Sequence, residues 1–410
     1  MHLRSAAFAA LLIPTLARAQ QVLVVSPTAG PGVFSTSLAT AVNSAQNGDV
    51  VLVKAGSYSE SFPIPILGKS LVITAEAGAT VALNGQLLIS GLSASQRVVV
   101  RGIDVTAHAQ FNALVLLNDS GPVWAERCTF KGGYQASAPT VAGMGGRVVG
   151  CAAAVFTRCA LLGGDDFSTN SDSGGIGLSS LDSNLYLSDT QCIGMDGEDG
   201  TSQFWSGNGG AGASVTGGSL FATGSLFQGG KGGSNSTPLP VGAGNGGAGL
   251  ALTASGVAVD CVFVGGRGGT SSVGPGVNGA GVSGATLTVL PGAARHFAVD
   301  SPVREGQSTT MHLGGLPNES VGVIYGPVPS SLVALPAFGG ALLIDAATSS
   351  GLILGNLSPT GSLSVPVAMP MLPASVLAVP LHLQAVFFDA PLTYAALGPP
   401  SSLLLLDSTL

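Results

Sequence analysis

The sequence predicts an all-β protein whose larger part is a solenoid of stacked short strands. Five segments share one Cys-x-Phe-x-Gly-Gly-like frame, with first positions 31, 33, 33 and 36 residues apart, namely Cys128, Cys159, Cys192, Ser225 and Cys261. Short β-type runs such as Leu250–Thr253 lie between the segments, and no helical periodicity appears there. Short strands that return at nearly constant spacing indicate coils that stack on one another.

Residues 1–19 have the pattern of a secretory signal peptide. Arg4 precedes an apolar run from Ala6 to Leu16, and Ala17-Arg18-Ala19 fits a small-x-small cleavage site. We therefore expect a secreted bacterial protein that is extracellular or held at the cell surface. Removing Arg4 and Arg18 leaves 12 basic against 21 acidic residues, and this balance predicts no nucleic-acid partner.

The apolar composition predicts a large buried core and no transmembrane segment. Hydrophobic residues make up 46% of the chain and charged residues 9%. The uncharged stretch Val365–Phe388 is long enough to span a bilayer, but it contains Pro366, Pro370, Pro373 and Pro380. Each proline removes a donor that a membrane helix needs.

The solenoid is assigned to residues 20–300, beginning with a short helical cap. Leu38, Ala41, Val42 and Ala45 fall on one helical face, and Asn47-Gly48 fits a helix end. A helix over about residues 35–48 would cover the apolar interior of the first coil, which a solenoid requires.

Part of the chain resembles a known family of solenoids. The run Ala45-Gln-Asn-Gly-Asp-Val-Val-Leu-Val-Lys-Ala-Gly-Ser-Tyr-Ser-Glu60, followed by Ser70–Thr74 and Val98–Ile103, resembles right-handed parallel β-helix proteins of the pectin-lyase-like superfamily. The resemblance covers about residues 22–300 and implies a right-handed parallel β-helix. It implies no single activity, because this fold hosts lyases, hydrolases, adhesins and inert scaffolds.

The composition changes near Pro302. Cysteine and tryptophan vanish, and no Lys or Arg follows Arg304. Strand-like runs continue, separated by Pro and Gly at intervals typical of a β-sandwich. We assign residues 301–410 to a separate, small all-β domain that is similar to C-terminal β modules of secreted bacterial proteins.

Ionisable residues cluster in one part of the repeat. The residue two positions after the first Gly of each segment, or after its substitute, is Tyr134, Asp165, Glu198, Lys231 and Arg267 in turn. If the coils superpose, these side chains form a row on one flank. Residues 165–199 also hold 8 of the 21 acidic residues.

Two interpretations of this row remain open. In the first, carboxylates bind Ca²⁺, which prefers hard oxygen ligands, beside a bound sugar chain. The resemblance to polysaccharide lyases then implies Lys231 or Arg267 as catalytic base. The candidate metal ligands are Asp165, Asp196, Glu198 and Asp199, and the candidate binding residues are Asp165, Asp166, Glu198, Asp199, Tyr134 and Trp205. In the second, the row is a solvated stack of turns whose exposed Glu198–Lys231 pair contributes about 0–1 kcal/mol.

The sequence contains no complete catalytic set. A hydrolase of the polygalacturonase type would add Gly-His-Gly and Arg-x-Lys motifs to Asp165-Asp166, and neither is present. The histidines are isolated and predicted to be structural; they are His108, His296, His312 and His382.

Glycines and cysteines of the repeat are also predicted to be structural. The Gly-x-Gly-x-x-Gly runs at Gly207–Gly212 and Gly244–Gly249 are interpreted as coil corners that need positive φ. Cys128, Cys159 and Cys192 are predicted on successive rungs, either as buried thiols or as bridged pairs.

Three functions follow from these patterns. The leading hypothesis is a non-catalytic module that binds glycans or a cell-surface macromolecule, is adhesive, or is structural. The alternative is a Ca²⁺-dependent polysaccharide lyase or glycoside hydrolase acting on an acidic polysaccharide. A third hypothesis is that the solenoid presents the C-terminal domain for sorting or anchoring.

Overall fold

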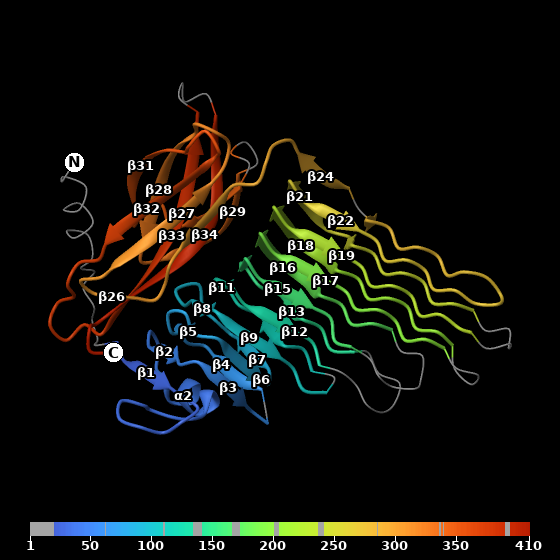
Figure 1. Ribbon diagram of the computed structural model, residues 1–410, viewed down its shortest axis with the longest axis horizontal. Coiled ribbons are helices and arrows are strands. Elements are labelled where there is room, and N and C mark those ends of the chain that lie inside the picture. The colour runs from blue at the N-terminus through green and yellow to red at the C-terminus, as the bar shows by residue number, and fades with distance from the viewer. Residues whose placement is uncertain are drawn as a thin grey trace.

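The computed structural model describes residues 20–61, 63–109, 111–133, 142–165, 173–200, 205–236, 242–284, 286–335, 338, 340–389 and 394–410. Over these residues the chain forms a parallel β-helix followed by a β-sandwich that packs along one side of it (Figure 1). The predicted fold class is confirmed by the strand register. The predicted signal peptide, residues 1–19, lies outside the described residues.

The β-helix has three parallel faces, which each coil visits in the order face 1, face 3, face 2. Face 1 comprises β1 (Val22–Val25), β2 (Val50–Val53), β5 (Leu71–Ala75), β8 (Val98–Arg101), β11 (Val123–Glu126), β14 (Ala154–Thr157), β21 (Ser255–Val259) and β24 (Leu287–Leu290). Face 2 comprises β4 (Ile64–Leu67), β7 (Leu87–Ser90), β10 (Leu114–Leu117), β13 (Gly146–Val149), β20 (Leu250–Leu252) and β23 (Val282–Gly284). Two long strands bend from face 2 onto face 1, namely β16 (Leu178–Ser188) and β18 (Ala213–Thr223).

Face 3 is a separate sheet, formed by β3 (Gly56–Ser59), β6 (Val81–Asn84), β9 (Ile103–Thr106), β12 (Thr129–Lys131), β15 (Ala160–Leu162), β17 (Gln191–Ile193), β19 (Leu226–Gln228) and β22 (Val262–Val264). Side chains alternate between interior and exterior along every strand. Residues in register therefore stack into continuous apolar rows. One interior row of face 1 runs Val51, Ile73, Val100, Ala125, Phe156, Leu187, Ala222, Ala258 and Val289.

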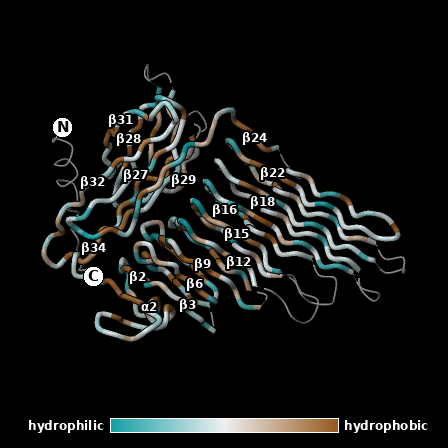
Figure 2. Tube along the Cα trace, viewed as in Figure 1, coloured by the Kyte–Doolittle hydropathy of each residue, from teal (hydrophilic) through white to brown (hydrophobic). Residues whose placement is uncertain are grey.

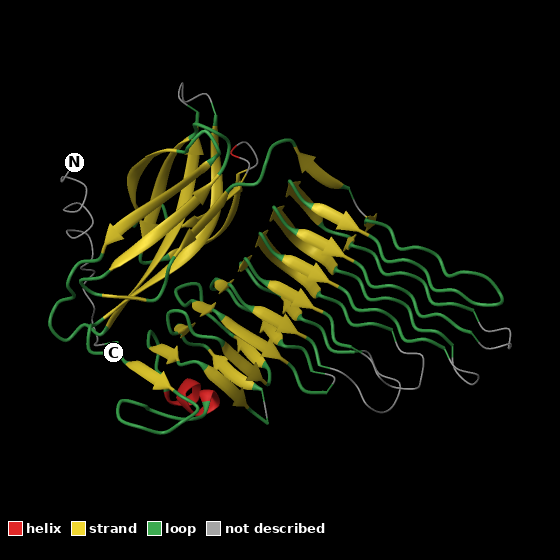
Figure 3. Cartoon of the chain, viewed as in Figure 1, coloured by secondary structure: helices red, strands yellow, loops and turns green. Residues whose placement is uncertain are grey.

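A short helix, α2 (Leu38–Ser44), covers the N-terminal end of this interior. Ser37 is its N-cap and accepts the Thr40 N–H at 3.1 Å, while Leu38, Ala41 and Val42 are fully buried. The helix is shorter than the predicted span 35–48 because Ala45 is already extended. The red helix at the base of the coils in Figure 3 shows this cap.

The register of the cysteines differs from the prediction. Cys128 and Cys159 do lie on successive interior rungs, but Thr190 takes the next rung, because Gln191 pairs with Ala160. Cys192 instead lies between Leu161 and Phe227. Side chains two residues apart in a strand point to the same side, so Thr190 and Cys192 both lie in the interior. An apolar pattern therefore does not distinguish the two registers.

All five cysteines are free thiols. Alkylation in denaturant without reductant is expected to modify all five, and fewer would contradict the structure. In the native protein at about pH 8 we expect slow labelling, because the thiolate is the reactive form. Burial raises the pKa of Cys151 and of Cys261 to about 11. Mass spectrometry of both samples measures the two outcomes.

The C-terminal sandwich places two sheets face to face. One contains β25 (His296–Val299), β27 (Ser308–Gly314) and β32 (Ser362–Ala368), and the other contains β26 (Val303–Arg304), β34 (Ala395–Leu406), β33 (Ala378–Phe388), β28 (Ser320–Gly326) and β31 (Ser350–Asn356). A hairpin of β29 (Pro329–Leu335) and β30 (Gly340–Ile344) packs against the second sheet, where the Gln384 side chain of β33 bonds to Leu343 N and Ala341 O. Phe297, Met311, Val323 and Phe387 are among the residues that fill the space between the sheets.

The sandwich covers face 1 of the β-helix. One exterior row of face 1 is apolar and consists of Val50, Val72, Val99, Trp124, Val155, Tyr186, Phe221 and Val257. Ala341, Leu343 and Ile344 of β30 pack against most of this row, and Leu404 and Leu406 of β34 pack at its N-terminal end. Face 1 is therefore buried on both sides, and Figure 2 shows hydrophobic strands in both units.

No helix within the described part of the chain has the length and apolar character needed to cross a membrane.

Candidate functional site

Glycine-rich segments extend from the β-helix between faces 3 and 2 and form what we call the glycine blade. It comprises the described residues of 163–177, 194–212, 229–249 and 265–281, drawn as long stacked loops in Figure 3. Successive coils are joined at every third residue, as in Gly194 N to Gln228 O (2.8 Å) and Gly197 N to Lys231 O (2.7 Å). A period of three is that of a polyproline-II-like chain, which leaves its backbone free to bond to neighbours.

Two layers of the blade also bond to each other. Gly210 N donates to Met195 O, Gly230 N to Gly210 O, and Gly247 N to Gly230 O, each at 2.8 Å. A Cβ on Gly247 would overlap the carbonyl oxygen of Gly210. The prediction that Gly207–Gly212 and Gly244–Gly249 turn corners with positive φ is wrong, because none of these glycines has positive φ. They are required where backbones approach closely.

The predicted ladder of ionisable residues is corrected at one rung. Gly163 N bonds to Ile193 O, Gly194 N to Gln228 O, and Gly229 N to Val264 O, which sets Gly163, Gly194, Gly229 and Gly265 in register. The residues two positions later are Asp165, Asp196, Lys231 and Arg267. Glu198 lies two residues beyond this row, in register with Gly233. Tyr134 and Asp166 lie outside the described residues.

The carboxylates of the blade bond to the protein itself. Asp165 pairs with Lys131 at 2.6 Å. Asp196 accepts the Lys231 N–H and Asp199 accepts the Ser234 N–H, both at 2.6 Å. Among the described residues, no three His, Cys, Asp or Glu side chains come together as a metal site. Trp205 is 68% exposed at the outer part of the blade.

A second polar row lies where face 1 turns into face 3. From β8 to β21, the residue after each strand segment of face 1 has positive φ, between 49° and 69°, and these residues are Gly102, Arg127, Arg158, Asp189, Gly224 and Asp260. We call this stack the corner ladder. Its conformation favours Gly, Asn and Asp, so the two arginines are unusual there. Four charged side chains thus emerge from one edge of the β-helix.

The corner ladder faces the sandwich across an open cleft of about 720 Å³. Arg127, Arg158 and Asp189 line one wall, and His296 of β25 and His312 of β27 line the other. His296 Nδ1 lies 2.9 Å from Asp189 Oδ1, and this hydrogen bond raises the pKa of His296. His312 Nε2 lies 3.2 Å from Asp300 Oδ2. The cleft is therefore built by both units together.

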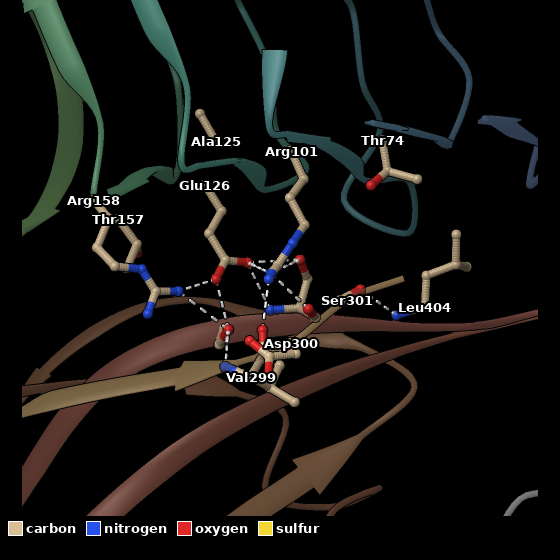
Figure 4. Close-up of polar contacts among 12 residues, drawn as sticks. Thr74, Arg101, Ala125, Glu126, Thr157, Arg158, Val299, Asp300, Ser301 and Leu404 are labelled. Carbon is tan, nitrogen blue, oxygen red and sulfur yellow. Dashed lines mark hydrogen bonds and ion pairs between the residues drawn. The ribbon is translucent and has the colours of Figure 1, made fainter. Parts of the chain in front are cut away.

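A buried ion cluster beside the cleft holds the two units together (Figure 4). The Glu126 carboxylate pairs with Arg101 and Arg158 and accepts the Ser401 hydroxyl at 2.6 Å and the Ser402 N–H at 2.9 Å. Burial by itself raises the pKa of Glu126, but the two guanidinium groups outweigh it and lower that pKa to about 2.

Arg101 completes this cluster from the β-helix side. Its guanidinium donates to Ser402 O at 2.8 Å and to Val299 O at 2.6 Å. Both oxygens belong to the sandwich, so one buried cation anchors two of its segments. Arg158 spans the cluster and the cleft, since it also donates to Phe297 O at 2.9 Å.

The positions of the corner ladder follow a regular spacing in the sequence, but the predicted repeat frame left one of its residues out. From Arg127 onward, each rung comes one residue before the first position of a segment, as Arg127 precedes Cys128 and Asp260 precedes Cys261. In the third segment the true first position is Thr190, so its rung is Asp189. Starting that segment at Cys192 removed Asp189 from the row. His296 and His312, interpreted as isolated, meet the row only because the sandwich docks on face 1.

Comparisons with known proteins add little. No family model matches the sequence, and no curated protein matches it. Among solved structures, the chain is similar to the pectate lyase Pel9A, with a TM-score of 0.28, 12% identity, and coverage of 66% of this chain and 80% of that one. It is also similar to the PL6 family alginate lyase AlyGC, with a TM-score of 0.26, 17% identity and coverage of 68% of this chain.

The chain spans 41% of the length of that alginate lyase. TM-scores this low support no conclusion on activity. The assignment of the fold depends instead on the parallel register of the strands.

Proposed function

We propose that this protein is a secreted or surface-associated, non-catalytic module that binds an acidic polysaccharide. The observation that carries the proposal is the open cleft, where two arginines of the corner ladder face two histidines of the sandwich. Arg127 is exposed and presents a guanidinium group, whose planar fork matches a carboxylate. Uronate or sulfated sugars offer such anions at regular intervals.

The cleft favours recognition over catalysis. Asp189 lines the cleft and pairs with His296, and two neighbouring carboxylates are also engaged, Asp300 with His312 and Asp260 with the Ala294 N–H at 2.9 Å. A general acid or base must reach the proton it transfers, and these carboxylates are already held by partners within the protein. Anion binding needs only an exposed guanidinium group, and Arg127 supplies one.

Replacing Arg127 with glutamate is expected to weaken binding to uronate polymers at least about tenfold, because a charge-assisted hydrogen bond is lost and a like charge is introduced. Arg147→Glu is the matched control, since Arg147 is exposed on β13 of face 2, away from the cleft. Isothermal titration with a panel of pectate, alginate and sulfated glycans measures both variants.

Equal losses in Arg127→Glu and Arg147→Glu would contradict the cleft as the binding site. Release of unsaturated products from any uronate polymer, with or without Ca²⁺, would contradict a non-catalytic role and favour the lyase alternative. In that case Asp165→Ala and Lys231→Ala show whether the glycine blade carries the activity.

A further inference from the structure

The two ends of the β-helix differ. At the N-terminal end, α2 covers the first coil. At the C-terminal end, the last strands are β22, β23 and β24, and each pairs on one side only, with β19, β20 and β21 respectively. One edge of each strand therefore lacks a neighbouring strand. The chain leaves this end toward the sandwich, and both described termini lie at the other end of the β-helix (Figure 1).

The apolar interior opens at this last coil. Val289 belongs to the interior row of face 1 and is 65% exposed, whereas Ala222 and Ala258 below it are fully buried. Phe263 stacks on the buried Phe227 at 5.1 Å between ring centroids and is itself only half-buried. Exposure of an interior row indicates a surface that is covered in the working molecule.

The unpaired edges of β22, β23 and β24 lack the features that usually prevent edge-to-edge pairing. Proteins usually block such edges with charged residues, prolines within the strand or a covering segment. Arg267 is the only charged residue among residues 262–290, and β22, β23 and β24 contain neither charge nor proline. Val262, Val273 and Val277 add exposed apolar side chains to the same coil.

We propose that a second copy of this chain covers the open end, in a two-fold symmetric arrangement that joins last coil to last coil. A two-fold interface places each surface against an identical one, so an almost uncharged surface matches itself without repulsion. The coil 262–290 is also as large as one side of a stable interface, about 20–30 residues. Stacking head to tail is closed off, because α2 occupies the opposite end.

Val289→Lys tests this directly. The substitution is accommodated in the monomer because the side chain is already largely exposed. In the dimer the ammonium group would lose its hydration, so we expect the dimer dissociation constant to rise at least about 100-fold, tenfold for each copy. Sedimentation velocity of the full chain over a range of concentrations measures it. Leu67→Lys, on an exposed residue of β4 near the other end, is the matched control.

A dimer that is lost in Val289→Lys and kept in Leu67→Lys supports the proposal. A wild-type monomer at high concentration, an open series of larger oligomers, or a dimer that survives Val289→Lys overturns it. Hydrogen exchange of the wild-type protein gives an independent readout. Amides of β22 and β24 are expected to gain protection as concentration rises, and no change would overturn the proposal even if the variant failed to fold.

Discussion

Glu126→Gln is expected to lower the free energy of unfolding by about 3–5 kcal/mol, the cost of breaking a buried ion pair by removing one partner. The reason lies in Arg101, whose side chain is 4% exposed. Without the carboxylate, this guanidinium and that of Arg158 stay beside each other in the interface. Ser401 and Ser402 lose a charged acceptor at the same time.

The matched control is Glu76→Gln. Glu76 also joins the β-helix to the sandwich, through Arg304 at 3.1 Å, but both side chains of this pair are about a third exposed. An ion pair accessible to solvent contributes about 0–1 kcal/mol. Urea denaturation of the wild-type protein, Glu126→Gln and Glu76→Gln measures the difference in the free energy of unfolding. Losses of equal size in the two variants would show that burial of the Glu126 cluster has no special importance.

The same cluster predicts a dependence on pH. Glu126 in the folded protein has a pKa of about 2, below its ordinary value of 4.5. As pH falls, the unfolded chain takes up this proton first, so folding loses stability. The contribution of Glu126 is complete above 4.5 and declines as pH falls toward 2. Part of the acid sensitivity should therefore be absent from Glu126→Gln.

Gly247→Ala is expected to destabilise the glycine blade by about 1–3 kcal/mol, the usual cost of overpacking. An added Cβ would overlap the carbonyl oxygen of Gly210. Gly247 also donates to Gly230 O at 2.8 Å, so moving its backbone away breaks a hydrogen bond between the layers. Because the blade loops of successive coils bond to one another, we expect the neighbouring loops to open before the strands of the β-helix do.

Gly242→Ala is the control within the same blade. A Cβ there meets only the Trp205 ring, at 3.9 Å, which is ordinary contact. Limited proteolysis and hydrogen exchange report opening of the blade, and each 1.4 kcal/mol corresponds to about a tenfold rise in the open population. Equal rates of proteolysis and exchange in Gly247→Ala and Gly242→Ala would contradict the idea that Gly247 is required for close approach of the backbones.

Much of the architecture could be predicted from sequence because it is repetitive. Periodic spacing predicted coils, and the helical face of Leu38, Ala41 and Val42 predicted the cap that the structure shows. The predicted register was wrong at Cys192, because interior positions of a strand lie two residues apart and a cysteine occurs in both interior rows. The repeat glycines were predicted to provide positive φ. The structure instead requires glycine there because a Cβ would overlap the backbone of a neighbouring coil.

The candidate site was predicted less well, because it depends on contacts between distant parts of the chain. Asp196 and Asp199 were predicted as candidate metal ligands, yet each accepts a backbone N–H of the next coil. Arg158 and His296 meet only after the sandwich docks. One clue to docking was present: Val50–Val53 and Val98–Val100 are apolar without alternation, which is typical of strands buried on both faces.

Docking of the sandwich along face 1 has a consequence for how the protein matures. Solenoids usually fold coil by coil, since each coil contacts only its neighbours. Here Val50 of an early coil packs against Leu404 and Leu406 of β34, which come much later in the chain. A chain synthesised or exported from its N-terminus would keep the outer side of face 1 exposed until β34 emerges. Truncation near residue 400 should therefore yield an aggregation-prone, protease-sensitive β-helix, so that solubility depends on the presence of β34.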